Sequence, residues 1–240
     1  MTAVVTGGSR GIGRAIVERL CRDGAEVVFN YATSEEAAAD VVRAVQADGG
    51  KVRAVRLDLK DPDGAERLME TAEAQLGGLD ILVNNAAMSF TPTPIAQTEA
   101  EVFDTVMAVN TRSVFLTTRY AARRMRDGGR IVNISTLNTT RPAPGIGPYA
   151  ASKGAIEQLT AVAARELGAR GITVNTVSPG ATDTDLLHAT NPPQALETVI
   201  GVTPLGRLGQ PSDVADVVAF LAGPDGRWIT GQNLRATGGL

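Results

Sequence analysis

The 240-residue sequence predicts a doubly wound α/β fold, in which helices cover both faces of a parallel β-sheet. Short, nearly continuous apolar runs alternate with amphipathic helical patterns, and such runs are typical of strands in a sheet buried on both faces. No linker rich in Pro, Gly or Ser, no repeat and no low-complexity tract divides the chain. We therefore expect a single domain over residues 1–240, although this length would also allow two.

The first two strands and helices are defined by clear start and stop signals. The run TAVVTG predicts the first strand, and a helix follows from Ile12 to about Arg22, with Gly24 as its stop. The run AEVVFNY predicts the second strand. The next helix, in TSEEAAADVVRAVQA, opens with a capping box formed by Thr33 and Glu36.

The middle of the chain continues the alternation. The run KVRAVRLDL predicts the third strand, and Asp61 and Pro62 suit the cap and first position of the helix that follows. The run LDILVNNAA predicts the fourth strand. A long helical pattern then extends from about Thr98 to Arg126, and GRIVNIS predicts the fifth strand.

The last third adds two more strands and one irregular region. A helix is predicted from about Tyr149 to Ala169, then a strand in ITVNTVSPG, a helix from Ser212 to Leu221, and a closing strand near NLRAT. Residues 181–209 show little periodicity. Long loops in compact domains are often functional, so we expect this region to cover a substrate.

Charge and hydropathy exclude several classes of function. The net charge of −3 and the pI of about 5.3 offer no basic face to a nucleic acid. No apolar run approaches the roughly 18 residues that span a bilayer, so we expect no membrane contact. The sequence enters a strand and a glycine turn at once, without the features of a signal peptide, which favours a cytoplasmic location.

The single cysteine and the single histidine narrow the chemistry further. Cys21 cannot form a disulfide within the chain, which suits a reducing compartment. His188 lies in the loop-like segment TDTDLLHATNPP, which disfavours a Ser-His-Asp hydrolase. One His and one Cys cannot assemble a zinc site of the Cys/His type, and we expect no bound metal.

A glycine-rich turn connects the first strand to the first helix. Residues Thr6–Gly13 read TGGSRGIG. Backbone N–H groups at the start of a helix attract a phosphate, and glycines let the backbone approach it closely. The order strand, glycine turn, helix therefore predicts a site for the phosphates of a dinucleotide. Arg10 lies within the turn and is a candidate clamp for an additional phosphate.

The end of the second strand bears on the choice between NADH and NADPH. Proteins that bind NAD usually place Asp or Glu about 20 residues after the turn, where it binds the ribose hydroxyls. Here the strand ends FNYATS, and Glu35 comes only inside the next helix. The side chains of Asn30, Thr33 and Ser34 can donate hydrogen bonds to a 2′-phosphate. Together with Arg10, they favour NADPH over NADH.

Six motifs occur in order at compatible spacing. They are TGGSRGIG, LDL around Asp58, NNAA at Asn84–Ala87, Asn110 in VNT, YAASK at Tyr149–Lys153, and SPG at Ser178–Gly180. With them the chain resembles the short-chain dehydrogenase/reductases along its whole length, in particular their 3-oxoacyl-acyl-carrier-protein reductase-like branch. Two departures, NNAA for the more usual NNAG and RATGG where VDGG is frequent, leave the chemistry untouched.

The resemblance implies a Rossmann-type sheet of about seven strands, a nicotinamide cofactor, an Asn-Ser-Tyr-Lys type of catalytic set, and a homotetramer or homodimer. It also implies that Asp58 and Leu59 lie beside the adenine and that residues 177–184 pass beside the nicotinamide. The candidate catalytic residues are Asn110, Thr136, Tyr149 and Lys153. The candidate cofactor-binding residues are Gly7, Ser9, Arg10, Gly11, Ile12, Gly13, Asn30, Tyr31, Ser34, Asp58, Leu59, Asn84, Ala86, Tyr149, Lys153, Pro179, Gly180, Thr182 and Thr184.

The spacing of Tyr149 and Lys153 has a physical reason. Residues four apart on a helix share a face, about 6 Å apart along the axis. A phenol has a pKa near 10, and a nearby ammonium favours the phenolate, so we expect Lys153 to lower the pKa of Tyr149. Tyr149 would donate a proton to a substrate carbonyl as hydride arrives. Asn110 is a candidate water site that relays protons through Lys153.

A second hydroxyl should hold the carbonyl oxygen and stabilise its developing charge. The serine of the family lies about 13 residues before the tyrosine, and here Thr136 occupies that position. Ser135 is one place early. Successive side chains of a strand point to opposite faces, so the two hydroxyls cannot both face Tyr149 while the strand continues. The spacing favours Thr136.

The substrate itself is only loosely defined by the sequence. Thr136, Asn138, Ile146, Leu186 and Leu187 are candidate substrate contacts that suit a modest apolar carbonyl compound. The acyl-carrier-protein reductases of the family tend to carry basic residues near the pocket mouth. Here Arg170 matches one such position, whereas Asp127 stands near another. A carrier-bound substrate is therefore allowed but not preferred.

The leading hypothesis is an NADPH-dependent oxidoreductase that reduces a ketone or β-keto compound to an alcohol. A second hypothesis is an NAD-dependent alcohol dehydrogenase. A third is a regulator that senses a nucleotide without chemistry, and the intact pair of Tyr149 and Lys153 argues against it.

Overall fold

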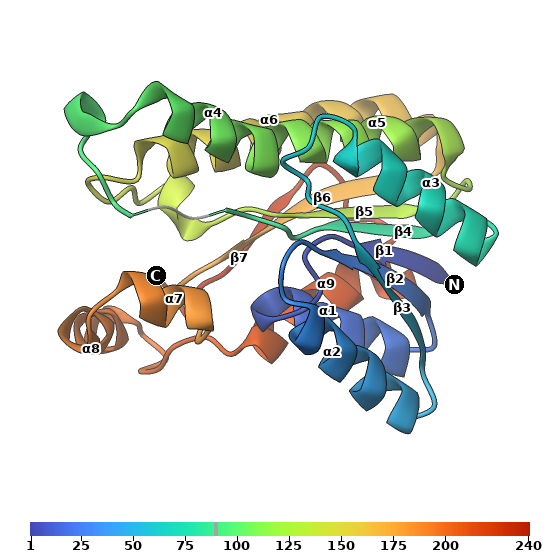
Figure 1. Ribbon diagram of the computed structural model, residues 1–240, viewed down its shortest axis with the longest axis horizontal. Helices are drawn as coiled ribbons and strands as arrows, with labels where there is room; N and C mark the ends of the chain where they lie inside the picture. The colour runs from blue at the N-terminus through green and yellow to red at the C-terminus, as the bar shows by residue number, and fades with distance from the viewer. Residues whose placement is uncertain (89–90) are drawn as a thin grey trace.

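One parallel sheet lies at the centre of the structure, a computed structural model that describes residues 1–88 and 91–240 (Figure 1). Within those residues the sheet has seven strands in the order β3-β2-β1-β4-β5-β6-β7. The predicted doubly wound α/β fold is thus confirmed. The strands are β1 (Thr2–Val5), β2 (Glu26–Tyr31), β3 (Lys51–Arg56), β4 (Ile81–Asn84), β5 (Arg130–Ile134), β6 (Thr173–Pro179) and β7 (Asn233–Ala236).

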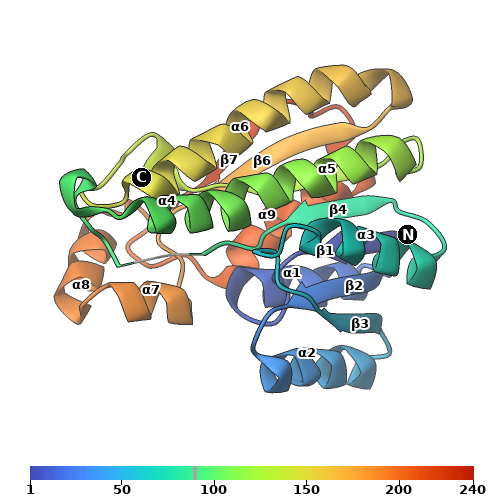
Figure 2. The ribbon, with the colours of Figure 1, turned by 45° about the horizontal axis from the view of Figure 1, so that its top comes forward.

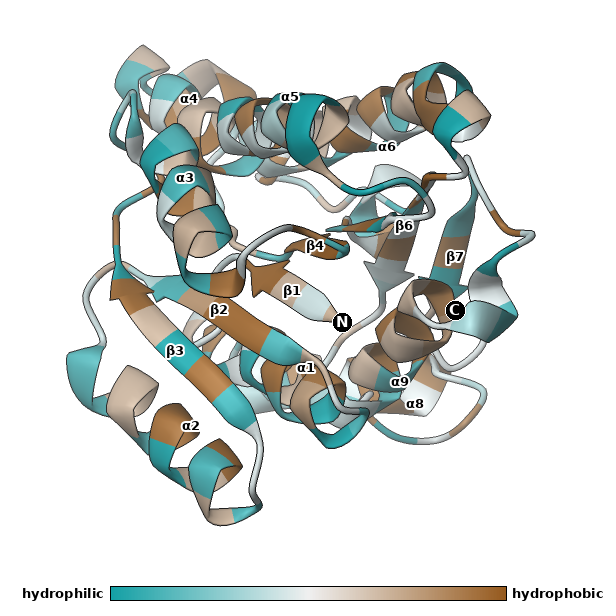
Figure 3. Ribbon diagram, turned by 90° about the vertical axis from the view of Figure 1, so that its right-hand side faces the viewer, coloured by the Kyte–Doolittle hydropathy of each residue, from teal (hydrophilic) through white to brown (hydrophobic). Residues whose placement is uncertain are grey.

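Helices cover both faces of this sheet. Figure 1 shows α3, α4, α5 and α6 over one face and α1, α2 and α9 under the other. The helices are α1 (Gly11–Arg22), α2 (Glu35–Ala47), α3 (Gly64–Leu76), α4 (Ala100–Met107), α5 (Ser113–Arg124), α6 (Gly147–Leu167), α7 (Asp185–Thr190), α8 (Pro193–Val202) and α9 (Pro211–Ala222). Since the sheet is covered twice, all residues of β4 and β6 are buried. Figure 3 shows hydrophobic residues, in brown, along much of β1, β2 and β4.

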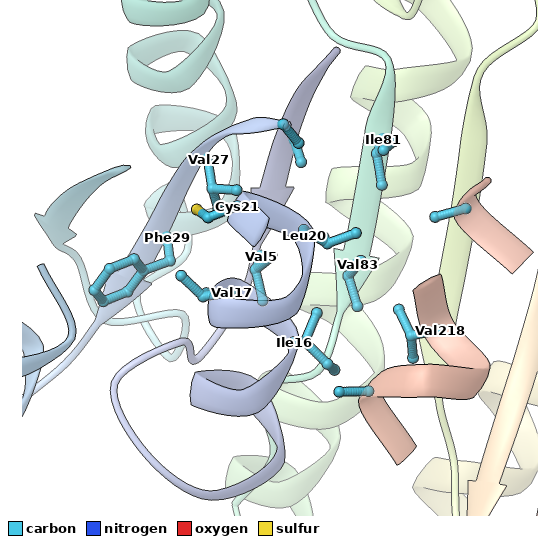
Figure 4. Close-up of a cluster of buried hydrophobic side chains, with 14 of the residues drawn as sticks. Val5, Ile16, Val17, Leu20, Cys21, Val27, Phe29, Ile81, Val83 and Val218 are labelled. Atoms are coloured by element: carbon cyan, nitrogen blue, oxygen red, sulfur yellow. The ribbon is translucent and has the colours of Figure 1, made fainter. Parts of the chain in front are cut away.

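The core under the sheet fixes the position of the first helix. Ile16 and Leu20 of α1 pack with Phe29 of β2, Val83 of β4 and Val218 of α9 in one buried cluster (Figure 4). Burying each large aliphatic side chain contributes roughly 1.5–3 kcal/mol. The amino end of α1, which begins at the glycine turn, is therefore held in place by the packing of the rest of the helix.

The sheet order places a topological switch point at the carboxyl end of β1, and we refer to the region beyond that end as the crevice. β1 is flanked by β2 and β4, so the chain leaves in opposite directions on its two sides, and ligands of open α/β sheets bind at such a switch point. The short helices α7 and α8 lie beyond this edge (Figure 2). Their segment leaves and returns at one place, because Gly209 N donates to Ala181 O at 2.9 Å and Asp183 N donates to Gly209 O at 2.8 Å.

Two predicted helix starts are wrong. The capping box of Thr33 and Glu36 does not form: α2 begins at Glu35 after Ser34, and no side chain caps it, because Thr33 engages Glu35 N through its backbone carbonyl. Asp61 and Pro62 precede α3, which begins at Gly64, because the chain first makes a tight turn in which Gly64 N donates to Asp61 O at 3.1 Å.

The long helical pattern from Thr98 to Arg126 is interrupted in the structure. Residues 108–112 form one π-helical turn between α4 and α5. Such turns insert one extra residue into a helix and occur frequently at functional sites. In the described part of the chain, no helix has both the length and the apolar character needed to cross a bilayer.

Candidate active site

The glycine turn between β1 and α1 is packed too tightly for side chains. A Cβ atom on Gly13 would lie 2.1 Å from Gly7 O, and one on Gly8 would lie 2.6 Å from the Cβ of Phe29. Gly7 and Gly11 have φ angles of +67° and +53°, which side chains of L-residues disfavour. The turn therefore needs its glycines, and it brings the first N–H groups of α1 to the crevice.

Asn30 holds this turn from the second strand. Its Oδ1 accepts from Gly7 N at 2.9 Å and its Nδ2 donates to Leu57 O at 2.9 Å, while the side chain is only 3% exposed. The structure therefore contradicts the predicted contact of this side chain with a 2′-phosphate. Its amide is turned inward because the glycine turn and β3 both present backbone groups that need a partner.

Thr6 and Asn85 fasten the same turn to β4. Thr6 Oγ1 accepts from the backbone N atoms of Asn85 and Ala86 at 2.9 and 3.0 Å. In return, Asn85 Nδ2 donates to the carbonyl oxygens of Thr6 and Gly7 at 3.0 and 3.1 Å. These reciprocal bonds hold Ala86 directly against Gly7, since a Cβ atom on Gly7 would lie 2.9 Å from Ala86 Cα.

The residues predicted to surround the adenosine lie at the ends of β2 and β3. Arg10 is exposed and has an extended backbone where α1 begins, and Ser34 precedes α2. Asp58 follows β3, and its Oδ1 accepts from Lys60 N at 2.9 Å. Leu59 is buried in the core between the sheet and α3, so its side chain is directed away from the crevice. Of the remaining candidates, Ser9 is buried, whereas Ile12 and Tyr31 are partly buried against the core.

Tyr149 and Lys153 lie in the first two turns of α6, at the carboxyl end of β5. Lys153 is 1% exposed, and its Nζ donates to Ile134 O at 2.8 Å. The ammonium nitrogen lies 5.9 Å from the centre of the Tyr149 ring. The helix thus presents a partly buried phenol and a fully buried ammonium on one face, as their spacing predicts.

The pKa values of this pair are set mainly by burial. Burial raises the pKa of Tyr149 above its usual value, and a hydrogen bond with Thr136 acts in the opposite direction. Burial also lowers the pKa of Lys153 to about 8. The expectation that Lys153 lowers the pKa of Tyr149 is therefore wrong for this geometry, because the loss of water around the phenol dominates. Tyr149 stays protonated at neutral pH.

Thr136 and Ser135 point in different directions, as successive residues at the end of a strand should. Thr136 is the hydroxyl that acts on the phenol, since it lowers the pKa of Tyr149, and its Oγ1 accepts from Asn138 N at 3.3 Å. Ser135 Oγ instead donates to Glu157 Oε1 at 2.7 Å, one helical turn beyond Lys153. The structure therefore brings Thr136, and not Ser135, to the phenol.

Asn110 lies in the π-helical turn and is completely buried. Its Oδ1 accepts from Met88 N at 2.8 Å, and its Nδ2 donates to Met88 O at 3.2 Å and to Ser152 Oγ at 3.1 Å. Ser152 Oγ in turn donates to Tyr149 O at 2.7 Å. The side chain of Asn110 thus clamps the segment after β4 to the first turn of α6. Its predicted part in a water relay stays a prediction.

Asn84 belongs to a buried chain of polar side chains beneath the site. Its Oδ1 accepts from Thr117 Oγ1 at 2.7 Å, and its Nδ2 donates to Asn133 Oδ1 at 2.9 Å. The chain continues from Asn133 Nδ2 to Thr160 Oγ1 at 2.8 Å, and Thr176 Oγ1 donates to the same oxygen at 2.8 Å. The side chain of Asn84 thus faces α5 and β5 in the interior. The expected place of Asn84 along the cofactor groove stays a prediction.

The predicted nicotinamide side of the crevice follows β6. Pro179 ends the strand, and Thr182 is buried, with its Oγ1 donating to Gly180 O at 3.1 Å. Thr184 lies close to the glycine turn, since a Cβ atom on Gly11 would stand 3.2 Å from Thr184 Cγ2. The segment that follows β6 therefore lies next to the glycine turn that follows β1.

The candidate substrate residues come from three segments. Asn138 follows β5 in a short 3₁₀ turn, and Ile146 immediately precedes α6; both are partly buried. Leu186 and Leu187 lie on α7, where Leu186 is 46% exposed and Leu187 is partly buried. Among the described residues, no group of three or more His, Cys, Asp or Glu side chains gathers as a metal site requires.

Three residues that organise the site were missed by the sequence reasoning. Ser152 connects Asn110 to Tyr149, Asn85 fastens the glycine turn, and Glu157 occupies the hydroxyl of Ser135. Glu157 could have been found, because it follows Lys153 by four residues and so shares its helix face. The partners of Ser152 and Asn85 are distant in sequence, and no local pattern indicates them.

Comparisons with known proteins agree with this geometry. A family model described as Enoyl-(Acyl carrier protein) reductase matches residues 7–240. An uncharacterized oxidoreductase of Methylorubrum extorquens is 43% identical over 240 residues, covering 99% of this chain and 96% of the relative. The 3-oxoacyl-[acyl-carrier-protein] reductase of Staphylococcus aureus is 38% identical over 241 residues, covering 100% of this chain and 97% of the relative.

A solved structure is equally similar. The blue fluorescent protein from a metagenomic library, in complex with NADPH, superposes with a TM-score of 0.94 at 42% identity, covering 99% of this chain and 96% of the other. Sequence, fold and the arrangement of the crevice therefore lead to the same result. The chain belongs to the short-chain dehydrogenase/reductase family of oxidoreductases, on the side of that family where the 3-oxoacyl-acyl-carrier-protein reductases lie.

Proposed function

We propose that the protein reduces the carbonyl group of a ketone or β-keto compound with NADPH, and that residues 1–240 act as one dinucleotide-binding and catalytic domain. The observation that carries the proposal is the protonated Tyr149, which lies within the influence of Thr136 and one turn from the buried Lys153. The NADPH complex of a relative at 42% identity supports the choice of cofactor.

The crevice fits a dinucleotide by the chemistry of its donors. The first turn of α1 contains no acidic side chain and its amino end is not capped by one, so its N–H groups and positive dipole end are available to an anion. Gly7, Gly11 and Gly13 keep the backbone bare on the same side. When bound there, the nicotinamide supplies a hydride to the carbonyl carbon.

The catalytic residues of the chain supply the proton and the polar environment. We assign Tyr149 as the acid that gives its proton to the carbonyl oxygen, since its raised pKa keeps it protonated. Thr136 holds the same oxygen and stabilises its developing negative charge. Lys153 supplies a positive charge to the buried end of the site as long as the pH stays below its pKa of about 8. Asn110 holds this helical turn in register through Ser152.

The substrate is proposed to be a small molecule rather than a group on a carrier protein. The only side chain that matched a basic carrier-binding position is Arg170. Its Nε donates to Asp127 Oδ1 at 2.8 Å and its Nη1 donates to Ala122 O at 2.7 Å. A guanidinium held in this way has little left for an acidic partner. We propose that residues 181–209 cover the substrate, with Leu186 and Leu187 facing it as apolar contacts.

Assembly and location stay predictions. Phe103, Phe115 and Val162 are 43%, 47% and 54% exposed on α4, α5 and α6. Such apolar side chains on the outer helices support the expected homotetramer or homodimer. The expected cytoplasmic location has the support of the family alone.

The test is NADPH oxidation measured against a panel of ketones, β-ketoesters, quinones and imines. We expect turnover with ketones or β-ketoesters, and we expect Tyr149→Phe to lose it while still binding NADPH. Tyr120→Phe is the matched control, because Tyr120 Oη on α5 donates to Glu73 Oε2 on α3 at 2.5 Å.

Three results would contradict the proposal in different ways. Turnover of alcohols with NAD, together with tighter binding of NADH than of NADPH, would favour the alcohol dehydrogenase. Undiminished turnover in Tyr149→Phe would remove the tyrosine from the mechanism. Tight nucleotide binding without turnover of any carbonyl compound would favour a nucleotide-sensing regulator.

A further inference from the structure

We propose that Arg56, the last residue of β3, binds the 2′-phosphate of NADPH, and that the carboxylate of Glu35 competes with the phosphate for this guanidinium. The inference rests on the proposed function and names the side chains that make the site selective. Neither residue belongs to the glycine turn or to the end of β2, the two segments whose sequence favours NADPH.

The sheet register places Arg56 at the position where the phosphate is expected. β2 and β3 are parallel, and Tyr31 is paired with Arg56, so both strands end level with each other. Adjacent strands lie about 4.8 Å apart. In dinucleotide-binding folds, the end of the second strand lies beside the adenosine ribose, and an arginine nearby accommodates a 2′-phosphate. Arg56 is one strand away from that point and at the same edge of the sheet.

The inward turn of Asn30 makes a second donor necessary. Its amide is bound to Gly7 N and Leu57 O, so the end of β2 offers the phosphate one donor fewer than the sequence suggests. Arg10 stands at the other side of this edge, exposed and at the start of α1. Arg56 would complete a pair of guanidinium groups, one from each flank of β2.

Glu35 gives Arg56 a partner that can be exchanged. Arg56 Nη1 lies 3.9 Å from Glu35 Oε2, and the two side chains are 66% and 75% exposed. An ion pair that is so long and so exposed contributes little to stability. A phosphate carries more charge and accepts two parallel hydrogen bonds from a guanidinium, so it should displace the carboxylate.

The same pair explains why acids near this edge do not exclude NADPH. Glu35 and Glu36 both stand in the first turn of α2, close to the end of β2. Two carboxylates there would repel a phosphate. Arg56 offsets the negative charge of Glu35, its ion-pair partner. The repulsion between Glu35 and a bound phosphate therefore depends on Arg56.

The experiment measures the dissociation constants of NADPH and NADH for the intact protein and four variants. Arg56→Gln should raise the ratio of the NADPH constant to the NADH constant by about ten-fold, since a hydrogen bond to a charged group is lost. Glu35→Gln should lower that ratio by about three-fold. The double variant carries both Arg56→Gln and Glu35→Gln. In it, Glu35→Gln should change the ratio of the two constants by a different factor than in the parent protein, because the two charges act on one phosphate.

Arg53→Gln is the matched control. Arg53 lies three residues earlier on the same exposed strand, and its Nη1 contacts Glu26 Oε1 at 2.6 Å, toward the opposite end of the sheet. This variant removes the same charge from β3 and should leave the ratio within two-fold. Adenosine 2′,5′-bisphosphate and AMP, used as competitors, separate the contribution of the 2′-phosphate from that of the nicotinamide half.

The outcomes distinguish the inference from the proposed function. An unchanged ratio in Arg56→Gln, in a protein that binds NADPH, would overturn the inference and leave the proposed function intact. Equal losses in Arg53→Gln and Arg56→Gln would overturn it as well, since they would indicate only a general effect of charge. A protein that binds neither nucleotide would overturn both.

Discussion

Lys153 is an unusual residue because it combines a positive charge with complete burial. Its ammonium donates to one backbone carbonyl, Ile134 O, and burial lowers its pKa from 10.5 to about 8. Tyr149 is shifted in the opposite sense, toward the neutral phenol, by the same loss of water. Both shifts follow from burying groups that water would otherwise solvate. At neutral pH the phenol of Tyr149 therefore carries its proton.

The burial of Lys153 should cost stability. The shift from 10.5 to about 8 corresponds to about 3 kcal/mol, at about 1.4 kcal/mol for each pH unit. Since the folded pKa is lowered, the unfolded chain binds more protons between these values, and stability rises as the pH passes from about 8 to 10.5. We expect Lys153→Met to abolish turnover and to raise the free energy of unfolding at pH 7. The gain should shrink across that range in urea denaturation. An equal gain at every pH would contradict this account.

Thr136 and Ser135 test the identity of the second hydroxyl. We expect Thr136→Ala to reduce kcat for carbonyl reduction by about ten-fold or more, because one stabilising hydrogen bond to the developing charge is lost. Thr136→Ser should retain most of the activity. Ser135→Ala should have a much smaller effect on kcat, since this hydroxyl binds Glu157. Steady-state kinetics would decide, and the reverse order of the two alanine variants would overturn the assignment.

At the scale of elements, strand β5 and helix α6 form the frame of the site. Side-chain hydrogen bonds connect the end of β5 to α6, among them Lys153 Nζ to Ile134 O, Ser135 Oγ to Glu157 and Asn133 Nδ2 to Thr160. They extend over two turns of the helix and so fix its register against the strand. The position of the phenol relative to Thr136 is a consequence of this register.

The glycine turn gives a prediction at the same scale. Gly13→Ala places a methyl group 2.1 Å from the backbone oxygen of Gly7 and 2.5 Å from Asn85 Nδ2, so the turn must open. We expect this variant to lose at least about 100-fold in NADPH affinity, because misplaced N–H groups no longer meet the phosphates. Titration of NADPH fluorescence measures this. Gly201→Ala in α8 is the control: nothing lies within 4 Å of the added Cβ, and we expect unchanged affinity. Equal affinities in both variants would contradict the assigned role of the turn.

At the scale of the whole molecule, the fold was predictable because buried faces of strands and helices require apolar residues at regular positions in the sequence. The parallel sheet, its helices and the glycine turn all follow from alternating apolar runs, and the spacing from Tyr149 identified Thr136. The orientation of Asn30 and Asn84 was not predictable, because an amide can face a ligand or a distant backbone group and the local sequence is the same. The pKa of Tyr149 depends on burial by segments far along the chain, and this too leaves no local pattern.

The buried core between α1 and the sheet contains a cysteine, Cys21. Cys21 is 7% exposed beneath the sheet, and burial raises its pKa to about 12. A thiolate is the reactive form, so the folded protein should resist alkylation at neutral pH. Because this is the only thiol in the sequence, incorporation of iodoacetamide would report how often α1 separates from the sheet. We expect bound NADPH to slow the labelling, since it binds the folded state alone. Labelling at the same rate with and without NADPH would show that α1 opens independently of the dinucleotide site. The rate at which Cys21 is alkylated thus measures how often this part of the core opens.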